Sequence, residues 1–129
     1  KQKQDKGISK FLGNFQNSYT RYYNTRNERD GSLFLDQFKA IRIITDEQLI
    51  HVSRYIHLNP YTNYVVKSLE ELSNYPWSSF NDYLKGDSTF VDPGLVLDMF
   101  KNIDQYKQFV FDQADYQREL KLIEHLIME

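Results

Sequence analysis

Tyr55 and Asn59 are the two residues of this chain whose types and spacing point most directly to chemistry. They stand four residues apart near the end of a predicted helix, and side chains at that spacing share one helix face. A phenol can act as a nucleophile and a carboxamide oxygen can bind a hard cation. Two well-packed helix residues are the plainer interpretation of the same pattern.

The helix that carries this pair has a clear start signal. Thr45 precedes two acidic residues, and Gln48 follows it by three positions, which is the pattern of a capping box. Proline lacks a backbone N–H and disfavours helical geometry in the residue before it. We therefore expect a helix over residues 46–59, ended by Pro60.

A helical wheel separates the nearby histidines from Tyr55. Tyr55 and Asn59 lie together on one flank of the expected buried stripe, whereas His57 lies on the other flank. We interpret His57 as a structural residue or as one that faces a bound partner. His51 lies one turn before Tyr55, where it can assist the phenol or simply occupy the surface. The stripe itself consists of Leu49, Val52, Ser53 and Ile56.

Most of the remaining chain is predicted to be helical, with one exception. Residues 38–44 alternate apolar and basic side chains and are rich in isoleucine, which predicts a strand. One strand is not stable alone in water, so its partner must be residues 33–35, a second copy, or sequence outside this chain. Trp77 is expected in the core. The further helices are predicted at 8–26, 69–72, 75–84, 103–112 and 114–128. Another is predicted with Asp92 as its cap and Pro93 at its first helical position.

Composition limits the classes of function. The 129 residues suffice for one domain with a core, and 40% apolar with 26% charged residues is ordinary for a soluble globular protein. The absence of cysteine excludes disulfides and thiolate metal sites. No apolar run reaches membrane-spanning length, and no signal peptide opens the chain. We expect a soluble, cytoplasmic protein with no membrane partner.

Four motifs occur in a fixed order along the chain: SYTRYYN at 18–24, LFLDQFKAI at 33–41, SRYIHLNP at 53–60 and YPWSSF at 75–80. Together they closely resemble the REP-associated tyrosine transposases, which are relatives of the single-tyrosine HUH transposases of small bacterial insertion sequences. The resemblance covers about residues 8–85. It rests on all four motifs in register, because any one of them alone is a weak signal.

The resemblance implies a ferredoxin-like domain that binds single-stranded hairpin DNA and transfers it between sites. Its nucleophile falls on Tyr55, which would attack a DNA phosphate and leave a 5′-phosphotyrosine and a free 3′-hydroxyl. An ordinary phenol, with a pKa of about 10, is a poor nucleophile at neutral pH without help. In the family Mg²⁺ or Mn²⁺ supplies that help, held by a residue at the position of Asn59 and by an upstream His-hydrophobic-His pair.

One departure from the family pattern decides what this chain is expected to do. It contains no His-x-His, and His51 and His57 are six residues apart on another element. We therefore expect a C-terminal fragment that is inactive alone and binds no metal by itself. The expected fold is α+β but predominantly helical. Residues 1–85 would retain one strand or hairpin of the ferredoxin-like domain, and residues 86–129 would form a helical extension.

A second departure follows Pro60. Family members tend to have a basic residue and a glycine there, whereas this chain has Thr62 and Tyr64. The difference concerns local DNA contacts and leaves the assignment of the nucleophile unchanged.

The basic half of the chain contains the predicted DNA contacts. Residues 1–54 carry ten Lys/Arg against six Asp/Glu, a net +4, whereas residues 55–129 carry six against twelve, a net −6. Single-stranded or hairpin DNA and a second copy of the chain are the expected partners. A non-catalytic DNA-hairpin-binding relative and a helical protein-interaction domain remain as alternatives, the latter favoured by the acidic half. The predicted phosphate contacts are Arg21, Arg26, Lys39, Arg42 and Arg54.

Overall fold

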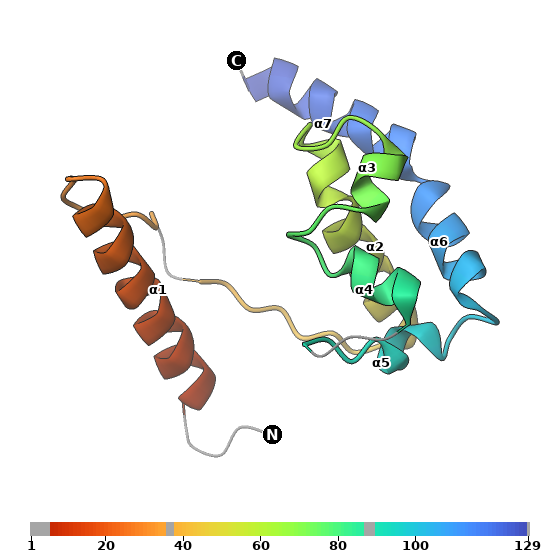
Figure 1. The fold of residues 1–129 in the computed structure, drawn as a ribbon, viewed down its shortest axis with the longest axis horizontal. Coiled ribbons are helices and arrows are strands. Elements are labelled where there is room, and N and C mark those ends of the chain that lie inside the picture. Colours follow the sequence, from red (N-terminus) through yellow and green to blue (C-terminus); the bar gives the residue numbers. More distant parts are fainter. Residues whose placement is uncertain (1–5, 36–37, 87–89, 129) are drawn as a thin grey trace. The chain divides into compact units, whose positions relative to one another are not determined.

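The computed structural model describes residues 6–35, 38–86 and 90–128, and every regular element in these residues is a helix (Figure 1). The chain divides into two compact units, Lys1–Arg42 and Ile43–Glu129. The prediction of a predominantly helical fold is therefore confirmed. Residues on both sides of the predicted 85/86 boundary belong to the second unit, and that boundary stays a prediction. No described helix is long and apolar enough to cross a membrane.

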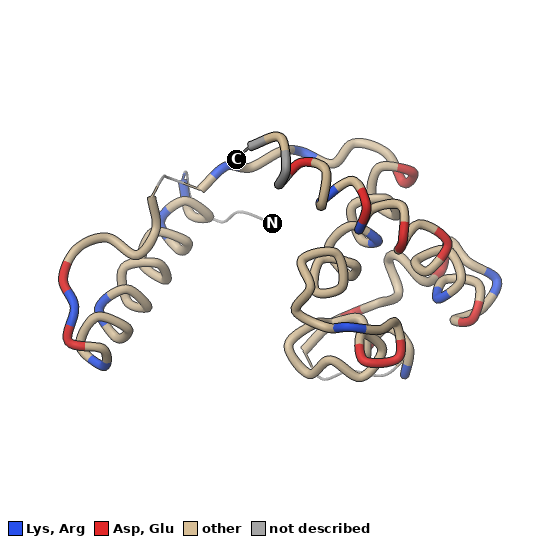
Figure 2. Tube along the Cα trace, turned by 90° about the horizontal axis from the view of Figure 1, so that it is seen from above, with Lys and Arg blue, Asp and Glu red and all other residues tan. Residues whose placement is uncertain are grey.

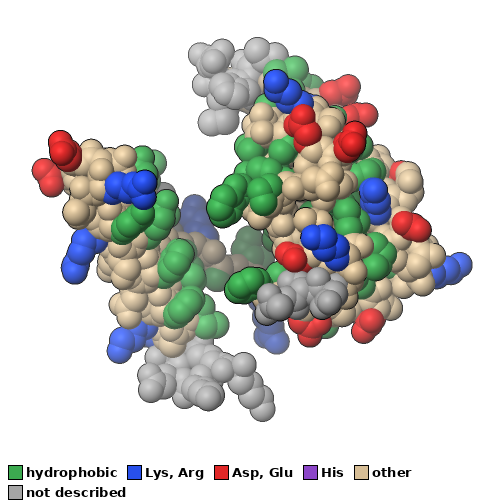
Figure 3. Space-filling model, viewed as in Figure 1, with side chains coloured by type: hydrophobic (Ala, Val, Ile, Leu, Met, Phe, Trp, Pro, Cys, Tyr) green, Lys and Arg blue, Asp and Glu red, His purple; other side chains and the backbone are tan. Residues whose placement is uncertain are grey.

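The first unit contains helix α1, Gly7–Arg26, which confirms the helix predicted at 8–26. None of its residues is buried, although apolar side chains recur along it at helical spacing. Phe11 and Phe15 are 68% and 60% exposed, and apolar side chains run along the helix in Figure 3. Tyr19 makes one of the contacts beyond the helix, with its ring centroid 6.4 Å from that of Phe34.

The strand predicted at residues 38–44 is wrong. These residues adopt neither helix nor strand, and residues 33–35 form bends instead of a pairing strand. A strand is stabilised by hydrogen bonds to a neighbouring strand, and no strand exists among the residues that the structure describes. The alternating pattern therefore has no sheet to join within this part of the chain.

Helix α2, Asp46–Thr62, begins where the sequence predicts. The Thr45 hydroxyl accepts a hydrogen bond from the Gln48 backbone N–H at 3.1 Å, which confirms Thr45 as the cap. The Gln48 side chain reaches back and accepts from the Ile44 N–H at 2.9 Å. The reciprocal bond thus ends one residue before the Thr45 N–H expected for a capping box.

The prediction that Pro60 ends α2 is also wrong, because the helix continues to Thr62. Proline removes only its own N–H bond, and two buried residues beyond it, Tyr61 and Thr62, hold the last turn in the core. The Pro60 carbonyl then accepts hydrogen bonds from the N–H groups of Val65 and Val66, at 2.8 and 3.1 Å. Packing and this C-terminal turn outweigh the local preference of proline.

Except for α4, the other helices of the second unit lie close to their predicted positions. Ser68 and Asn102 cap two of them by accepting from the backbone N–H three residues later. Gly86 ends another in the left-handed conformation, at φ +67°. The helices are α3 Leu69–Ser73, α4 Phe80–Lys85, α5 Gly94–Leu97, α6 Ile103–Phe111 and α7 Ala114–Met128.

Helix α4 starts five residues later than predicted, and this shift moves Trp77 to the surface. Residues 76–79 form turns and bends, and Trp77 is 84% exposed, so its assignment to the core is wrong. Phe80, the first residue of α4, is fully buried. Phe80 is the fully buried aromatic residue of this motif, and Tyr75 packs against the core while partly buried.

The core of the second unit lies where α2, α3, α4 and α6 meet. Tyr106 of α6 is fully buried at its centre, with the Phe100 and Tyr83 ring centroids 5.1 and 5.5 Å away. The other fully buried large side chains are Leu58, Leu72, Phe80 and Val110. These contacts fix the orientation of α2.

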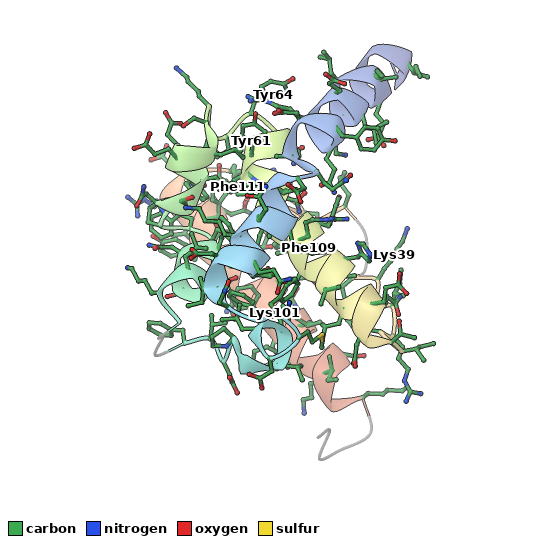
Figure 4. All side chains as sticks on the ribbon, turned by 90° about the vertical axis from the view of Figure 1, so that its right-hand side faces the viewer. Lys39, Tyr61, Tyr64, Lys101, Phe109 and Phe111 are labelled. Carbon is green, nitrogen blue, oxygen red and sulfur yellow. The ribbon has the colours of Figure 1, made fainter. Side chains whose placement is uncertain are left out.

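Helix α7 is attached by a stacked arginine to the end of α2, where Figure 4 labels Tyr61 and Tyr64. The Arg118 guanidinium carbon lies 4.1 Å from the ring centre of Tyr61 and 4.2 Å from that of Tyr64. Tyr61 also donates a hydrogen bond to Asp115 at 2.9 Å. A planar cation over an aromatic face is attractive, so two rings on one guanidinium tie the helices together.

Replacement of Arg118 by methionine tests this attachment. Methionine keeps an apolar stem but removes the cation–π contacts, so we expect about 1–2 kcal/mol less stability. Urea unfolding followed by circular dichroism measures the difference. Lys101→Met is the control, because Lys101 is exposed and lies at the other end of the unit from Tyr64 in Figure 4. Equal losses in the two variants would contradict the role of the stacked arginine.

Candidate functional site

Tyr55 lies on the outward flank of α2 and is 51% exposed. No hydrogen bond to its hydroxyl is found among the residues that the structure describes. The ring borders a surface hollow of about 240 Å³ between α2 and α7, which we call the Tyr55 hollow. Its lining residues are Tyr55 and Thr62 from α2 and Gln117, Leu120, Lys121 and Glu124 from α7.

Lys121 places a positive charge in this hollow. Its Nζ donates to the Glu124 carboxylate at 3.0 Å, one turn further along α7. That hydrogen bond and the Glu124 charge raise the pKa of Lys121, and Tyr55 adds to the increase. The ammonium is therefore protonated at neutral pH. Nothing in the sequence singled out Lys121, because it lies 66 positions after Tyr55 and belongs to no motif.

Asn59 follows Tyr55 by one turn and is partly buried. Its backbone carbonyl accepts from the Asn63 N–H at 3.0 Å and from the Asn63 side-chain amide at 2.9 Å. Its own carboxamide makes no hydrogen bond within the described part of the chain, so its oxygen is free to bind a ligand. The prediction that Asn59 binds a metal is neither supported nor opposed by this arrangement.

The described residues do not form a metal site by themselves. Among them there is no group of three His, Asp or Glu side chains placed to hold an ion. Asn59 would supply one oxygen, whereas Mg²⁺ takes six ligands in near-octahedral geometry, several of which are commonly waters. The predicted metal therefore depends on ligands other than Asn59, which the resemblance assigns to the upstream histidine pair.

The predicted DNA contacts fall in both units. Arg21, Arg26, Lys39 and Arg42 belong to the Lys1–Arg42 unit, and Arg54 belongs to the other. The first unit carries nine Lys/Arg against four Asp/Glu, a net +5, and the second carries seven against fourteen, a net −7. Figure 2 shows the two signs along the chain. The first unit is thus the stronger attractor for a polyanion.

Two of these arginines are partly engaged within the protein. Arg26 donates to the Tyr22 hydroxyl at 2.7 Å. Arg54 lies 4.3 Å over the Phe109 ring and contacts the His51 ring nitrogen at 2.8 Å, and burial lowers its pKa. Arg54 of α2 therefore has a structural role, because it packs on Phe109 of α6. Its role as a DNA contact stays a prediction.

His57 is a core histidine. It is 2% exposed, its Nδ1 lies 2.7 Å from the Tyr106 hydroxyl, and its Nε2 lies 2.9 Å from the Ser79 hydroxyl. The Tyr106 hydroxyl also lies 2.7 Å from that of Ser53. Burial lowers the pKa of His57 to about 4 and raises the pKa of Tyr106. Of the two roles predicted for His57, the structural one is confirmed.

This buried network accounts for several polar residues that the sequence alone did not connect. A neutral imidazole can accept at one ring nitrogen and donate at the other, which suits the two hydroxyl neighbours of His57. Ser53, on the expected buried stripe, is the other α2 member, whereas Ile56 of that stripe is 53% exposed. The buried face of α2 is therefore rotated toward His57.

Comparisons of the chain with models of protein families, with curated proteins and with solved structures find no match.

Proposed function

We propose that this chain is the C-terminal part of a single-strand DNA transposase of the REP-associated type, with Tyr55 as its nucleophile. The observation that carries the proposal is the position of Tyr55. It is half-exposed on a capped helix whose opposite face is fixed in the core, and it borders a hollow that contains a lysine. The four sequence motifs supply the reaction class.

The proposed step is a transesterification. The Tyr55 oxygen forms a bond to the phosphorus of a DNA phosphodiester while the bond from phosphorus to the 3′ oxygen breaks. The phenol loses one proton and the departing 3′ oxygen gains one, so no oxidant or other co-reactant is consumed. The phosphotyrosine retains the energy of the phosphodiester, and a 3′-hydroxyl can later attack it to rejoin the strand.

The remaining catalytic groups are assigned to the parent protein. The described residues form no metal site by themselves. The proposal requires the parent protein to supply a His-x-His pair. It follows that this chain alone should bind DNA without cleaving it.

The test uses the parent protein with end-labelled hairpin DNA and Mn²⁺, and a denaturing gel to detect a covalent adduct. We expect an adduct with the wild type and loss of at least 99% of it in Tyr55→Phe, because phenylalanine has no nucleophilic oxygen. Tyr116→Phe is the matched control, since Tyr116 is also an exposed tyrosine. Equal adduct from wild type and Tyr55→Phe would rule out Tyr55 as the nucleophile.

The same assay separates the alternatives. A parent protein that binds the hairpin in a salt-dependent manner but forms no adduct would be a non-catalytic DNA-binding relative. Absence of salt-dependent binding would favour a protein-interaction domain. The exposed Phe11 and Phe15 of α1 give that second alternative its structural support.

A further inference from the structure

We propose that Lys121 of α7 binds a non-bridging oxygen of the DNA phosphodiester that Tyr55 attacks, so that the Tyr55 hollow is the phosphate-binding subsite. This inference rests on the proposed function. It assigns a substrate contact to the chain's last helix, which no motif of the sequence covers.

The first support is position. Tyr55 and Lys121 come from different helices and line one hollow of about 240 Å³. The packing of Arg118 on Tyr61 and Tyr64, one turn before Lys121, fixes α7 against α2 at this place. The lysine is therefore held beside the phenol by the fold and does not reach it from a distant loop.

The second support is charge. Lys121 carries the only positive charge among the described residues that line the hollow. The surrounding unit has a net charge of −7 and repels a nucleic acid strand at long range. A phosphate can bind there only if a local cation offsets that repulsion. Attack on a phosphodiester also increases negative charge on its non-bridging oxygens, which a fixed ammonium stabilises.

The third support is that Lys121 and Gln117, which line the hollow, have hydrogen-bond donors without partners among the described residues. An ammonium has three N–H donors, and Glu124 accepts from Lys121 at 3.0 Å. The Gln117 side-chain amide also borders the hollow and has no hydrogen-bond partner within the described residues. Glu124 itself would repel a phosphate, so its contribution is to hold the lysine in place. An exposed ion pair one turn apart adds little to fold stability.

The test compares Lys121→Gln with wild type in the adduct assay on the parent protein. We expect at least a tenfold slower adduct formation at saturating hairpin DNA, and partial recovery in Lys121→Arg, which restores the charge. Lys101→Gln makes the same change in charge at an exposed site outside the hollow and should retain the wild-type rate. Adduct that depends on Tyr55 but forms equally fast in Lys121→Gln would overturn this inference and leave the proposed function intact.

A second readout does not depend on cleavage. The 129-residue chain, labelled with ¹⁵N, is titrated with a short single-stranded oligonucleotide and, separately, with inorganic phosphate. We expect the oligonucleotide to shift the backbone amide signals of Gln117 and Lys121, and the shifts to be lost in Lys121→Gln but kept in Lys101→Gln. Unchanged signals, or equal shifts with phosphate alone at the same concentration, would contradict a subsite for a DNA strand.

Discussion

Replacement of Tyr106 by alanine is expected to lower the free energy of unfolding by about 4 kcal/mol. The ring is fully buried and contacts the aromatic rings of Phe100, Tyr83 and His57. Its removal leaves a cavity and also deprives two buried polar groups, His57 Nδ1 and the Ser53 hydroxyl, of their partner. Small domains are stable by only about 5–15 kcal/mol, so the variant would lose much of its stability.

Urea unfolding of paired variants measures this effect. Tyr116→Ala removes the same side chain from an exposed site on α7 and should change stability by less than about 0.5 kcal/mol. Tyr106→Phe keeps the ring and removes only the hydroxyl, for which we expect a loss of about 1–2 kcal/mol. A loss in Tyr106→Ala no larger than that in Tyr116→Ala would show that the aromatic cluster does not hold the unit together.

The second large effect is a loss of stability in acid that depends on His57. Burial lowers the pKa of this histidine to about 4, below the ordinary value of 6.5 expected in the unfolded chain. Between these values the unfolded state binds the extra proton and the folded state does not. The contribution of His57 is therefore complete above about pH 6.5 and decreases as the pH falls toward 4. The expected decrease between pH 7 and pH 4 is about 3 kcal/mol.

Unfolding free energies measured from pH 4 to pH 7 test this effect. His57→Gln should be less stable than wild type at pH 7. Its unfolding free energy should also lack the decrease of about 3 kcal/mol toward pH 4 that His57 causes. His51→Gln removes an exposed histidine from the same helix and should keep the wild-type dependence. A wild-type slope that persists in His57→Gln would assign the proton uptake to other groups.

The sequence predicts the helices of this chain well, because their signals are local. The periodicity of residues 8–26 predicts α1, and Thr45 fixes the first residue of α2. Both α6 and α7 lie within one residue of their predicted bounds. A cap or an amphipathic stripe depends only on residues within a few turns, so no knowledge of the rest of the chain is needed.

The wrong predictions depend on distant parts of the chain. Residues 38–44 have the pattern of a strand, but a strand forms only beside another. Pro60 lies inside α2 because Tyr61 and Thr62 are buried against other helices, which a local rule about proline does not include. Trp77 is exposed because α4 starts late and directs Phe80 into the core in its place.

The candidate site shows the same division. The wheel predicts correctly that Tyr55 and His57 lie on different sides of one helix, since that relation is fixed by helical geometry. Lys121 was not predicted, because its position beside Tyr55 depends on how α7 packs on α2. The partners of His57, Tyr106 and Ser79, come from other elements for the same reason.

The two sides of α2 also bear on how such a protein can change over evolutionary time. Tyr55 is half-exposed, whereas Ser53, His57 and Leu58 are buried between other helices. A substitution at Tyr55 can therefore abolish the proposed chemistry at almost no cost to folding, while substitutions at the buried positions also lower the stability of the fold. Under the proposed function, one substitution at Tyr55 would therefore suffice to end cleavage while the folded scaffold persists, so loss of the chemistry and loss of the fold are separable events.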